Sequence, residues 1–177
     1  ASANTLEQQR KDYRAAQKAL KSGQTDLFNR LSADLKTYPL YPYLLHDYLK
    51  GRLWKVKDEE IIQFLQQHND LPMADDLRKD WLQLLISKGR WQVFLENYTP
   101  QQDTTLQCYQ LQARINTSNH AYLLEDARTI WLSGKSLPPQ CDPAFALLHK
   151  SELMTDELIW ERIRLAMQGG NTGLAGY

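Results

Sequence analysis

The chain has 177 residues, of which 42% are hydrophobic and 24% charged, and its 21 basic side chains equal its 21 acidic ones in number. This composition suits one globular domain or a piece of a larger helical array, and no run approaches the roughly 20 apolar residues that a membrane-spanning helix needs. A formal net charge of zero removes the basic footprint expected of a nucleic-acid-binding protein.

The first two predicted helices form a pair at the start of the chain. Thr5 is placed to cap the first helix, and Gln8 three residues later would complete a capping box. Gly23 ends that helix, and a second begins at about Thr25. The residues expected to point inward are Leu6, Tyr13, Ala16 and Leu20 from the first helix, and Leu27, Phe28, Leu31 and Leu35 from the second.

A proline-containing corner and two further helices follow. In the stretch YPLYPYLL (38–45), Tyr38 and Tyr41 each precede a proline, which disfavours helical backbone geometry and predicts a corner. Pro42 is suited to open a third helix that ends at Gly51. Asp58 is expected to cap a fourth helix.

The centre of the chain, LPMADDLRKDWLQLLISKGRW (71–91), has the pattern of a helix, a corner and a second helix. Pro72 suits a first helical turn, Gly89 suits the left-handed position after the helix, and Trp91 begins a new amphipathic run. Such a pair cannot bury both of its apolar faces by itself, so it needs neighbours of the same kind. The predicted inward face of the first helix consists of Ala74, Leu77, Trp81, Leu84 and Leu85.

The second half of the chain repeats this pattern. A polar loop over 98–103 precedes a helix, and Asn119 is expected to cap the next one. Asp142 would cap a short helix, and Thr155 or Asp156 the last one. The predicted inward residues are Leu106, Tyr109, Leu111, Ala113, Ile115, Tyr122, Leu124, Ala127, Ile130, Trp131, Phe145, Leu147, Leu148, Leu158, Ile159, Ile163, Ala166 and Met167.

The fold class predicted from these patterns is all-α. No segment of useful length alternates apolar and polar residues, and no hairpin turn of the Asn-Gly or Asp-Gly type occurs. We expect about ten helices, no sheet, and degenerate helix pairs stacked as a solenoid instead of a strict repeat. The final stretch GGNTGLAGY (169–177) offers no terminal capping helix, so we expect the array to continue beyond it.

The residues show no catalytic or metal-binding constellation. The four histidines, at 46, 68, 120 and 149, are scattered, and the acidic pairs at 59–60, 75–76 and 125–126 are explained by helix starts and faces. A GxSxG elbow, a P-loop and a GxGxxG motif are all absent from the sequence. We therefore assign no catalytic, metal-binding or cofactor-binding residue. We leave the substrate-binding residues unassigned. For the aromatic residues, core packing is favoured over the alternative that they stack on sugar rings.

The sequence contains two cysteines, Cys108 and Cys141. Their number alone fits one disulfide or two buried free thiols equally well. Neither belongs to a CxxC pair, so a zinc site or a thioredoxin-like site is disfavoured.

Five stretches together resemble one family. They are YPLYPYLL (38–45), LPMADDLRKDWL (71–82), QCYQLQAR around Cys108, WLSGKSLPPQCDPAF (131–145) and RIRLAMQGGNTGLA (162–175). In this order and spacing they are similar to the N-terminal helical region of the large soluble lytic murein transglycosylases of the Gram-negative periplasm. The resemblance covers essentially the whole chain, 1–177.

The resemblance implies a fold and an activity that the residues alone do not. In that family this region begins a long right-handed α-superhelix, followed by a linker and a lysozyme-like catalytic domain. The full enzyme cleaves the β-1,4 bond between N-acetylmuramic acid and N-acetylglucosamine to give a 1,6-anhydro product, using one Glu as acid and then base. That Glu precedes a Ser in the family, but none of the eight glutamates here does. No catalytic residue is carried over.

The resemblance also decides between the cysteine alternatives. Cys108 and Cys141 match cysteine positions of the family, and the periplasm oxidises thiols, so the resemblance implies a structural disulfide between them.

The leading functional hypothesis is a non-catalytic superhelical segment that builds a ring and guides peptidoglycan glycan strands beside its own catalytic domain, without cofactor or nucleic acid. The alternative is a free-standing α-solenoid that serves as a scaffold for periplasmic protein–protein interactions. A third hypothesis is a regulatory fragment that keeps affinity for glycan but has no catalytic activity.

Overall fold

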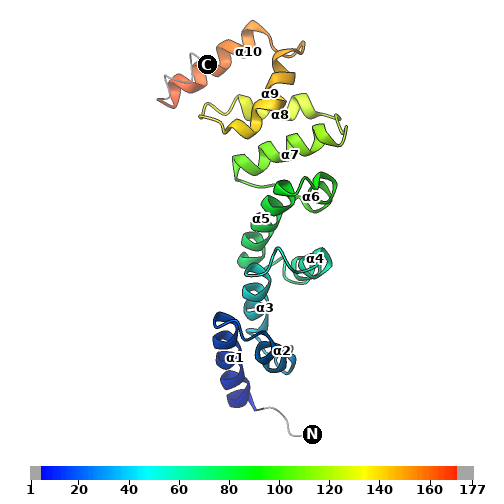
Figure 1. Ribbon diagram of the computed structural model, residues 1–177. Coiled ribbons are helices and arrows are strands. Elements are labelled where there is room, and N and C mark those ends of the chain that lie inside the picture. Colours follow the sequence, from blue (N-terminus) through cyan, green and yellow to red (C-terminus); the bar gives the residue numbers. More distant parts are fainter. Residues whose placement is uncertain (1–4, 171–177) are drawn as a thin grey trace. The chain divides into compact units, whose positions relative to one another are not determined.

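The computed structural model describes residues 5–170 (Figure 1). Within that range the backbone forms ten α-helices and one 3-10 turn, and no strand occurs there, which confirms the prediction of an all-α fold. The final stretch 171–177, including the end of the last family-like segment, lies outside the described residues. The elements are α1 (Leu6–Lys21), α2 (Thr25–Ala33), α3 (Tyr41–Lys50), α4 (Asp58–Gln67), α5 (Pro72–Ser87), α6 (Trp91–Asn97), α7 (Thr104–Asn116), α8 (Leu123–Trp131), η1 (Pro139–Cys141), α9 (Asp142–His149) and α10 (Asp156–Gln168).

The chain divides into two compact units, Ala1–Trp81 and Leu82–Tyr177, each with its own core. The boundary falls inside α5. None of the helices in the described part combines the length and the apolar character that crossing a lipid bilayer requires.

The first unit begins with the predicted pair, α1 and α2. The Thr5 hydroxyl accepts a hydrogen bond from the Gln8 backbone N–H at 3.2 Å, as a capping residue should. The Gln8 side chain does not complete a capping box but donates to Asp12 Oδ1 at 3.0 Å. Gly23, with φ at +74°, occupies the left-handed position that ends α1.

The core of the first unit gathers around α1, α2 and α3. The Tyr13 and Tyr38 rings lie 5.4 Å apart, and Phe28 stacks on Tyr48 at 5.1 Å. The prediction for Leu6 is wrong, because 54% of its surface is exposed. The 9-residue α2 is shorter than the 16-residue α1 and, folding back from the end of α1, leaves its first turn uncovered. The buried residues of this core are Ala16, Ala19, Phe28, Leu35, Tyr38 and Leu44.

Two predicted helix starts in the first unit shift by one residue. Tyr41 is itself the first residue of α3, since a proline at the second position of a helix is tolerated. Lys57, not Asp58, occupies the capping position of α4, and its backbone N–H donates to a Glu60 carboxylate oxygen at 3.0 Å. Asp58 instead accepts a hydrogen bond from the Trp81 indole at 3.3 Å, which ties the start of α4 to α5.

The central pair forms as predicted. Helix α5 begins at Pro72, Gly89 has φ of +68°, and α6 begins at Trp91. The prediction for Leu84 is wrong in detail, because Leu82 is buried in its place while Leu84 is only half-buried. Ala74, Leu77, Trp81 and Leu85 are buried as expected.

The second unit departs from prediction where α8 begins. Asn119 does not cap this helix; Tyr122 stands at the capping position with φ of +57° and 77% of its surface exposed. The cause is the buried Arg114, whose backbone carbonyl accepts from the Asn119 N–H at 2.8 Å and whose guanidinium donates to the Ala121 carbonyl. These bonds hold the connection in a non-helical path.

With this start of α8, Leu123 is buried in the core of the second unit, and the predicted Leu124 is partly buried against it. One further prediction shifts as well, since Cys141 occupies the capping position assigned to Asp142. Thr155 caps α10 as predicted, by accepting from the Leu158 N–H at 3.2 Å. Leu147, Ile159 and Met167, predicted to point inward, are exposed. The buried core consists of Cys108, Leu111, Leu123, Ala127, Trp131, Cys141, Ala144, Phe145, Leu148 and Leu158.

Candidate functional site

The first unit contains a cavity of about 480 Å³ beside α1 and α3. Residues from the last turns of α1 form one side, and the end of α3 with the segment 51–55 forms the other. This volume lies in the range of pockets that hold small molecules. The lining residues are Gln17, Leu20, Lys21, Asp47, Tyr48, Gly51, Arg52, Trp54 and Lys55.

The segment 52–55 is folded as a tight turn at the cavity. The Arg52 backbone carbonyl accepts hydrogen bonds from the N–H groups of Lys55 at 2.9 Å and Val56 at 3.0 Å. The Arg52 N–H in turn donates to the Leu49 carbonyl in the last turn of α3. Local hydrogen bonds therefore fix the backbone that carries Trp54.

Aromatic rings and cations alternate along this cavity. Trp54 exposes 65% of its surface, and the Lys55 ammonium lies 4.5 Å from the centre of its ring. The Arg52 guanidinium lies 5.2 Å from the Tyr48 ring centre and donates to Thr25 Oγ1 at 2.8 Å. The Tyr48 ring stacks on the Phe28 ring, and the angle between the two ring planes is 4°.

The cavity is positively charged. Lys21, Arg52 and Lys55 contribute three cations, and Asp47 contributes one carboxylate. Cations of this kind bind carboxylates, while exposed aromatic faces bind the apolar faces of planar or cyclic groups. The arrangement is therefore suited to a ring-containing anion.

Sequence reasoning missed this cavity, because it favoured core packing for the aromatic residues and could not say which of them line a groove. Its two sides lie about 30 positions apart in the chain, so no local pattern reveals it. The available signal was the segment RLWK (52–55), in which a tryptophan stands between two cations directly after a predicted helix end.

An ion-pair network lies next to the cavity, between α3 and α5. The Lys50 ammonium lies 2.5 Å from Asp76 Oδ2 and 3.7 Å from Asp80 Oδ2. The hydrogen bond from Lys50 holds the pKa of Asp76 below its ordinary value of 3.8, and the same bond raises the pKa of Lys50. The buried His46 places Nδ1 3.1 Å from Asp47 and Nε2 3.6 Å from Asp76. This network joins α3 to α5 and gives Asp76 a structural position, while Asp75 lies in the first turn of α5.

Two further acidic pairs also have structural positions. Glu59 and Glu60 lie in the first turn of α4, and Glu125 and Asp126 in the first turn of α8. Asp126 accepts from the buried Arg114 at 2.7 Å. Within residues 5–170, no three His, Cys, Asp or Glu side chains gather closely enough to hold a metal ion.

Cys108 and Cys141 form a disulfide in the second unit. Their Cα atoms lie 4.6 Å apart, and the bond joins α7 to η1, just before α9. Beside it, the Gln112 amide donates to the Gln140 carbonyl at 2.6 Å. Both sulfurs lie in the buried core, which gives the bond a structural position.

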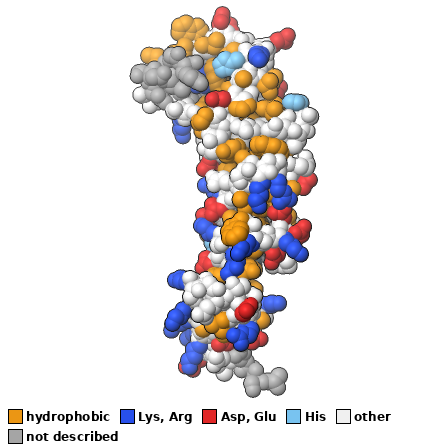
Figure 2. Space-filling model, in the orientation of Figure 1, with side chains coloured by type: hydrophobic (Ala, Val, Ile, Leu, Met, Phe, Trp, Pro, Cys, Tyr) orange, Lys and Arg blue, Asp and Glu red, His pale blue; other side chains and the backbone are white. Residues whose placement is uncertain are grey.

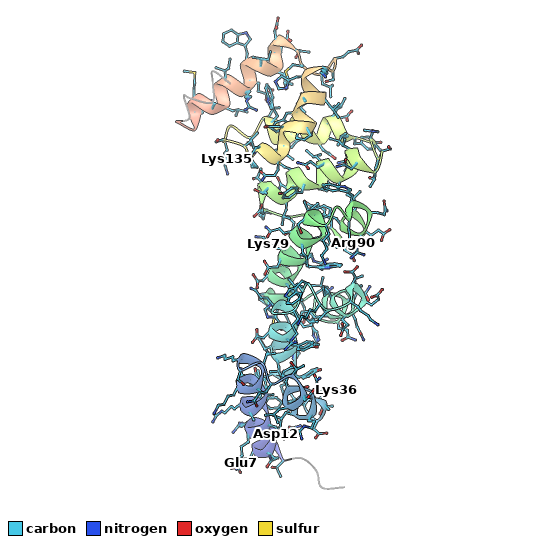
Figure 3. All side chains as sticks on the ribbon, viewed as in Figure 1. Glu7, Asp12, Lys36, Lys79, Arg90 and Lys135 are labelled. Carbon is cyan, nitrogen blue, oxygen red and sulfur yellow. A yellow bond between two sulfur atoms is a disulfide. The ribbon has the colours of Figure 1, made fainter. Side chains whose placement is uncertain are left out.

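The second unit exposes a tryptophan to a degree similar to that of Trp54. Trp160 on α10 exposes 69% of its surface and shares a shallow hollow with Glu157, Glu161 and Arg164. That hollow carries two carboxylates and one cation, the opposite balance to the cavity of the first unit. On the face drawn in Figure 2, basic and acidic side chains are interspersed, and Glu7, Lys36 and Lys135 in Figure 3 project into solvent.

No protein-family model matches the chain. Curated relatives do: the soluble lytic murein transglycosylase of Escherichia coli K12 is 32% identical over 98% of this chain, and that of Salmonella typhimurium is 33% identical over 98%. The chain spans 27% of the length of these relatives.

Solved structures agree with the sequence comparison. The crystal structure of the 70 kDa soluble lytic transglycosylase Slt70 from Escherichia coli matches with a TM-score of 0.82 and 32% identity, covering 97% of this chain and 28% of that one. An inactive mutant of the lytic transglycosylase Slt from Pseudomonas aeruginosa matches with a TM-score of 0.77 and 35% identity, covering 92% of this chain and 27% of that one.

The complex of the 70-kDa soluble lytic transglycosylase with bulgecin A matches with a TM-score of 0.83 and 32% identity, covering 96% of this chain and 28% of that one. The likeness in sequence and in helical fold extends over nearly every residue of this chain. It confirms the all-α superhelical fold class. The chain is therefore homologous to the soluble lytic murein transglycosylases and has the fold of their N-terminal region.

Proposed function

We propose that this chain is a non-catalytic superhelical segment of a peptidoglycan lytic transglycosylase that acts in the periplasm. In this proposal, residues 1–177 form the N-terminal part of the superhelical domain, and the linker and the lysozyme-like catalytic domain belong to the same longer polypeptide. The segment supplies the ring that supports the catalytic domain and guides glycan strands. The full enzyme cleaves the bond between N-acetylmuramic acid and N-acetylglucosamine and releases 1,6-anhydro products.

One observation carries this proposal: homology covers 98% of the chain but only 27% of the relatives. Helix packing also accounts for the acidic pairs that a sequence search for catalytic carboxylates would select. None of the eight glutamates precedes a serine, as the catalytic Glu of the family does. The Cys108–Cys141 disulfide supports an oxidising compartment. A relative that binds bulgecin A supports ligand binding within the family.

The catalytic part of the proposal is tested on purified murein sacculi. We expect the 177-residue chain to release no anhydromuropeptides, measured by liquid chromatography and mass spectrometry, while the full-length Escherichia coli relative releases them under the same conditions. Release by this chain above a heat-denatured sample would contradict a non-catalytic role.

The scaffold part needs the longer polypeptide, which the reading frame beyond Tyr177 should encode with a Glu-Ser motif. Deleting residues 1–177 from it should lower activity on sacculi more than activity on short soluble glycans, because only the long strands need guidance. Equal losses on both substrates would argue against guidance, and a stop codon near 177 would argue against the longer polypeptide.

The second candidate is a free-standing scaffold for periplasmic proteins. The exposed Ile159, Trp160 and Met167 on α10 favour it, because large apolar side chains on one helix suit protein contacts. A stop codon near 177 together with a defined binding partner would support this candidate over the first.

A further inference from the structure

We propose that the cavity beside α1 and α3 is a binding subsite for an anionic saccharide, a pyranose ring that bears a carboxylate. The source of this saccharide rests on the proposed function: it is an N-acetylmuramic acid unit of peptidoglycan. Its lactyl group and attached peptide carry the carboxylates.

The exposure of Trp54 is the first support. A tryptophan that serves packing is buried, as Trp81 is with 1% of its surface exposed. Trp54 exposes 65% and lines a cavity, held there by the hydrogen-bonded turn at 52–55. An indole face of this kind can stack on the C–H face of a sugar ring. Lys55 covers one face of the indole at an exposed site, where a ligand can displace it.

The position of Arg52 is the second support. Its guanidinium is held by a hydrogen bond to Thr25 and by the Tyr48 ring, so it is ordered before any ligand arrives. A guanidinium has five N–H donors and can therefore keep its contact with Thr25 while it donates to a carboxylate. Lys21 and Lys55 add positive charge at the same cavity.

The remaining lining residues suit the uncharged parts of such a ligand. Gln17 and Asp47 offer an amide and a carboxylate to sugar hydroxyl and acetamido groups, and Leu20 offers an apolar wall. A pocket that combines aromatic and aliphatic walls with a few polar groups orients its ligand through those groups. The cavity therefore selects for a ring and a negative charge together.

The test compares two soluble disaccharides by isothermal titration and NMR with the 177-residue chain. N-acetylglucosaminyl-N-acetylmuramic acid has a free lactyl carboxylate, and chitobiose has similar rings without charge. We expect the acidic disaccharide to bind about tenfold more tightly, since a charge-assisted hydrogen bond distinguishes the two. Equal affinity of the two sugars, or no binding of either, would overturn the proposal.

Two variants and a matched control locate the binding. Trp54→Ala should lower affinity for both sugars about tenfold or more, because the rings of both disaccharides lose a stacking partner. Lys55→Gln should lower affinity for the acidic disaccharide only. Trp160→Ala, which removes an equally exposed indole from an acidic hollow, should change neither affinity. Unchanged thermal unfolding of each variant shows that it folds, and a Trp160→Ala effect equal to that of Trp54→Ala would contradict a site in the cavity.

Binding and lytic function are read separately. Specific binding at Trp54 by a chain whose parent polypeptide lacks lytic activity would sustain the subsite and refute the proposed function. A lytic parent polypeptide whose Trp54→Ala chain binds the acidic disaccharide as well as the unsubstituted chain does would refute the subsite alone.

Discussion

The two compact units hold their helices together by different means. In the first unit, a surface network of Lys50, Asp76 and Asp80 joins α3 to α5. In the second unit, helices are connected by a buried disulfide and by the buried Arg114 and Arg162. The stability of the first unit should therefore depend on pH and salt. The stability of the second unit should depend on the disulfide being oxidised and on its buried hydrogen bonds.

The largest expected effect is loss of the disulfide. For the 33-residue separation of Cys108 and Cys141, loop-closure entropy gives about 3–4 kcal/mol of stabilisation. A Cys108→Ser and Cys141→Ser double variant should lose hydrogen-exchange protection in α7, α8 and α9 while α1 to α3 keep theirs. The reduced unsubstituted chain is the control and should behave alike. Equal loss of protection in both units would contradict this separation.

The next effect concerns the buried Arg114. Arg114→Met should lower the free energy of unfolding of the second unit by about 2–3 kcal/mol, because Asp126 and the Ala121 carbonyl lose a charged donor. Chemical denaturation measures the loss. Arg128→Met removes an exposed arginine from the same unit and should change the stability by less than about 0.5 kcal/mol. Similar losses for both variants would show that Arg114 has no special role.

A smaller difference in stability is expected when alanine replaces two glycines that both have positive φ. At Gly134, φ is +71° and an added Cβ would lie 3.0 Å from the Leu165 carbonyl oxygen, whereas at Gly23, φ is +74° with open space around it. Gly23→Ala should cost about 1–2 kcal/mol through backbone strain alone. Gly134→Ala should cost roughly 1 kcal/mol more, because α10 must also shift. Equal changes in the unfolding midpoints would mean that α10 shifts without a measurable cost in free energy.

The smallest effect belongs to the ion-pair network of the first unit. The pKa of Asp76 is lowered in the folded protein. Its contribution to the free energy of unfolding is therefore complete at pH values above its ordinary pKa of 3.8, and is lost as the pH falls through the lower folded pKa. The pKa of Lys50 is raised in the folded protein. Its contribution to the free energy of unfolding is complete at pH values below its ordinary pKa of 10.5, and is lost as the pH rises through the higher folded pKa. Both groups are largely solvent-exposed, so screening keeps the total below about 1 kcal/mol.

Asp76→Asn measures this contribution directly. The variant should be slightly less stable than the unsubstituted chain at neutral pH, and the difference should shrink in about 1 M salt and vanish in strong acid. Asp75→Asn, one position earlier on α5, is the control. A difference that persists at high salt would show that the network is less screened than its exposure indicates.

Local signals in the sequence predicted the elements well. Thr5 and Thr155 cap helices as expected, because a capping hydroxyl acts within three residues. Gly23 and Gly89 mark helix ends for the same local reason, a left-handed backbone position that glycine adopts readily. The all-α class follows from such signals summed along the chain.

Long-range contacts explain what the sequence could not predict. The start of α8 shifts because Arg114, on another helix, bonds to the Ala121 carbonyl. Asp58 is the first residue of α4 and accepts from Trp81, a partner 23 positions away that the local pattern could not indicate. Lys21 and Trp54 line the same cavity although they lie far apart in the chain, so no local pattern in the sequence predicts it.

The disulfide has a mechanical consequence for the second unit. It closes a covalent loop that contains all of α8, between Cys108 on α7 and Cys141 in η1. When the chain is stretched from its two ends, force passes through the sulfur atoms and bypasses α8. About 110 Å of extended contour, for 33 residues, stays out of reach until the bond is reduced. Tension applied at the two ends of the chain would therefore load the helices outside this loop and leave α8 unloaded.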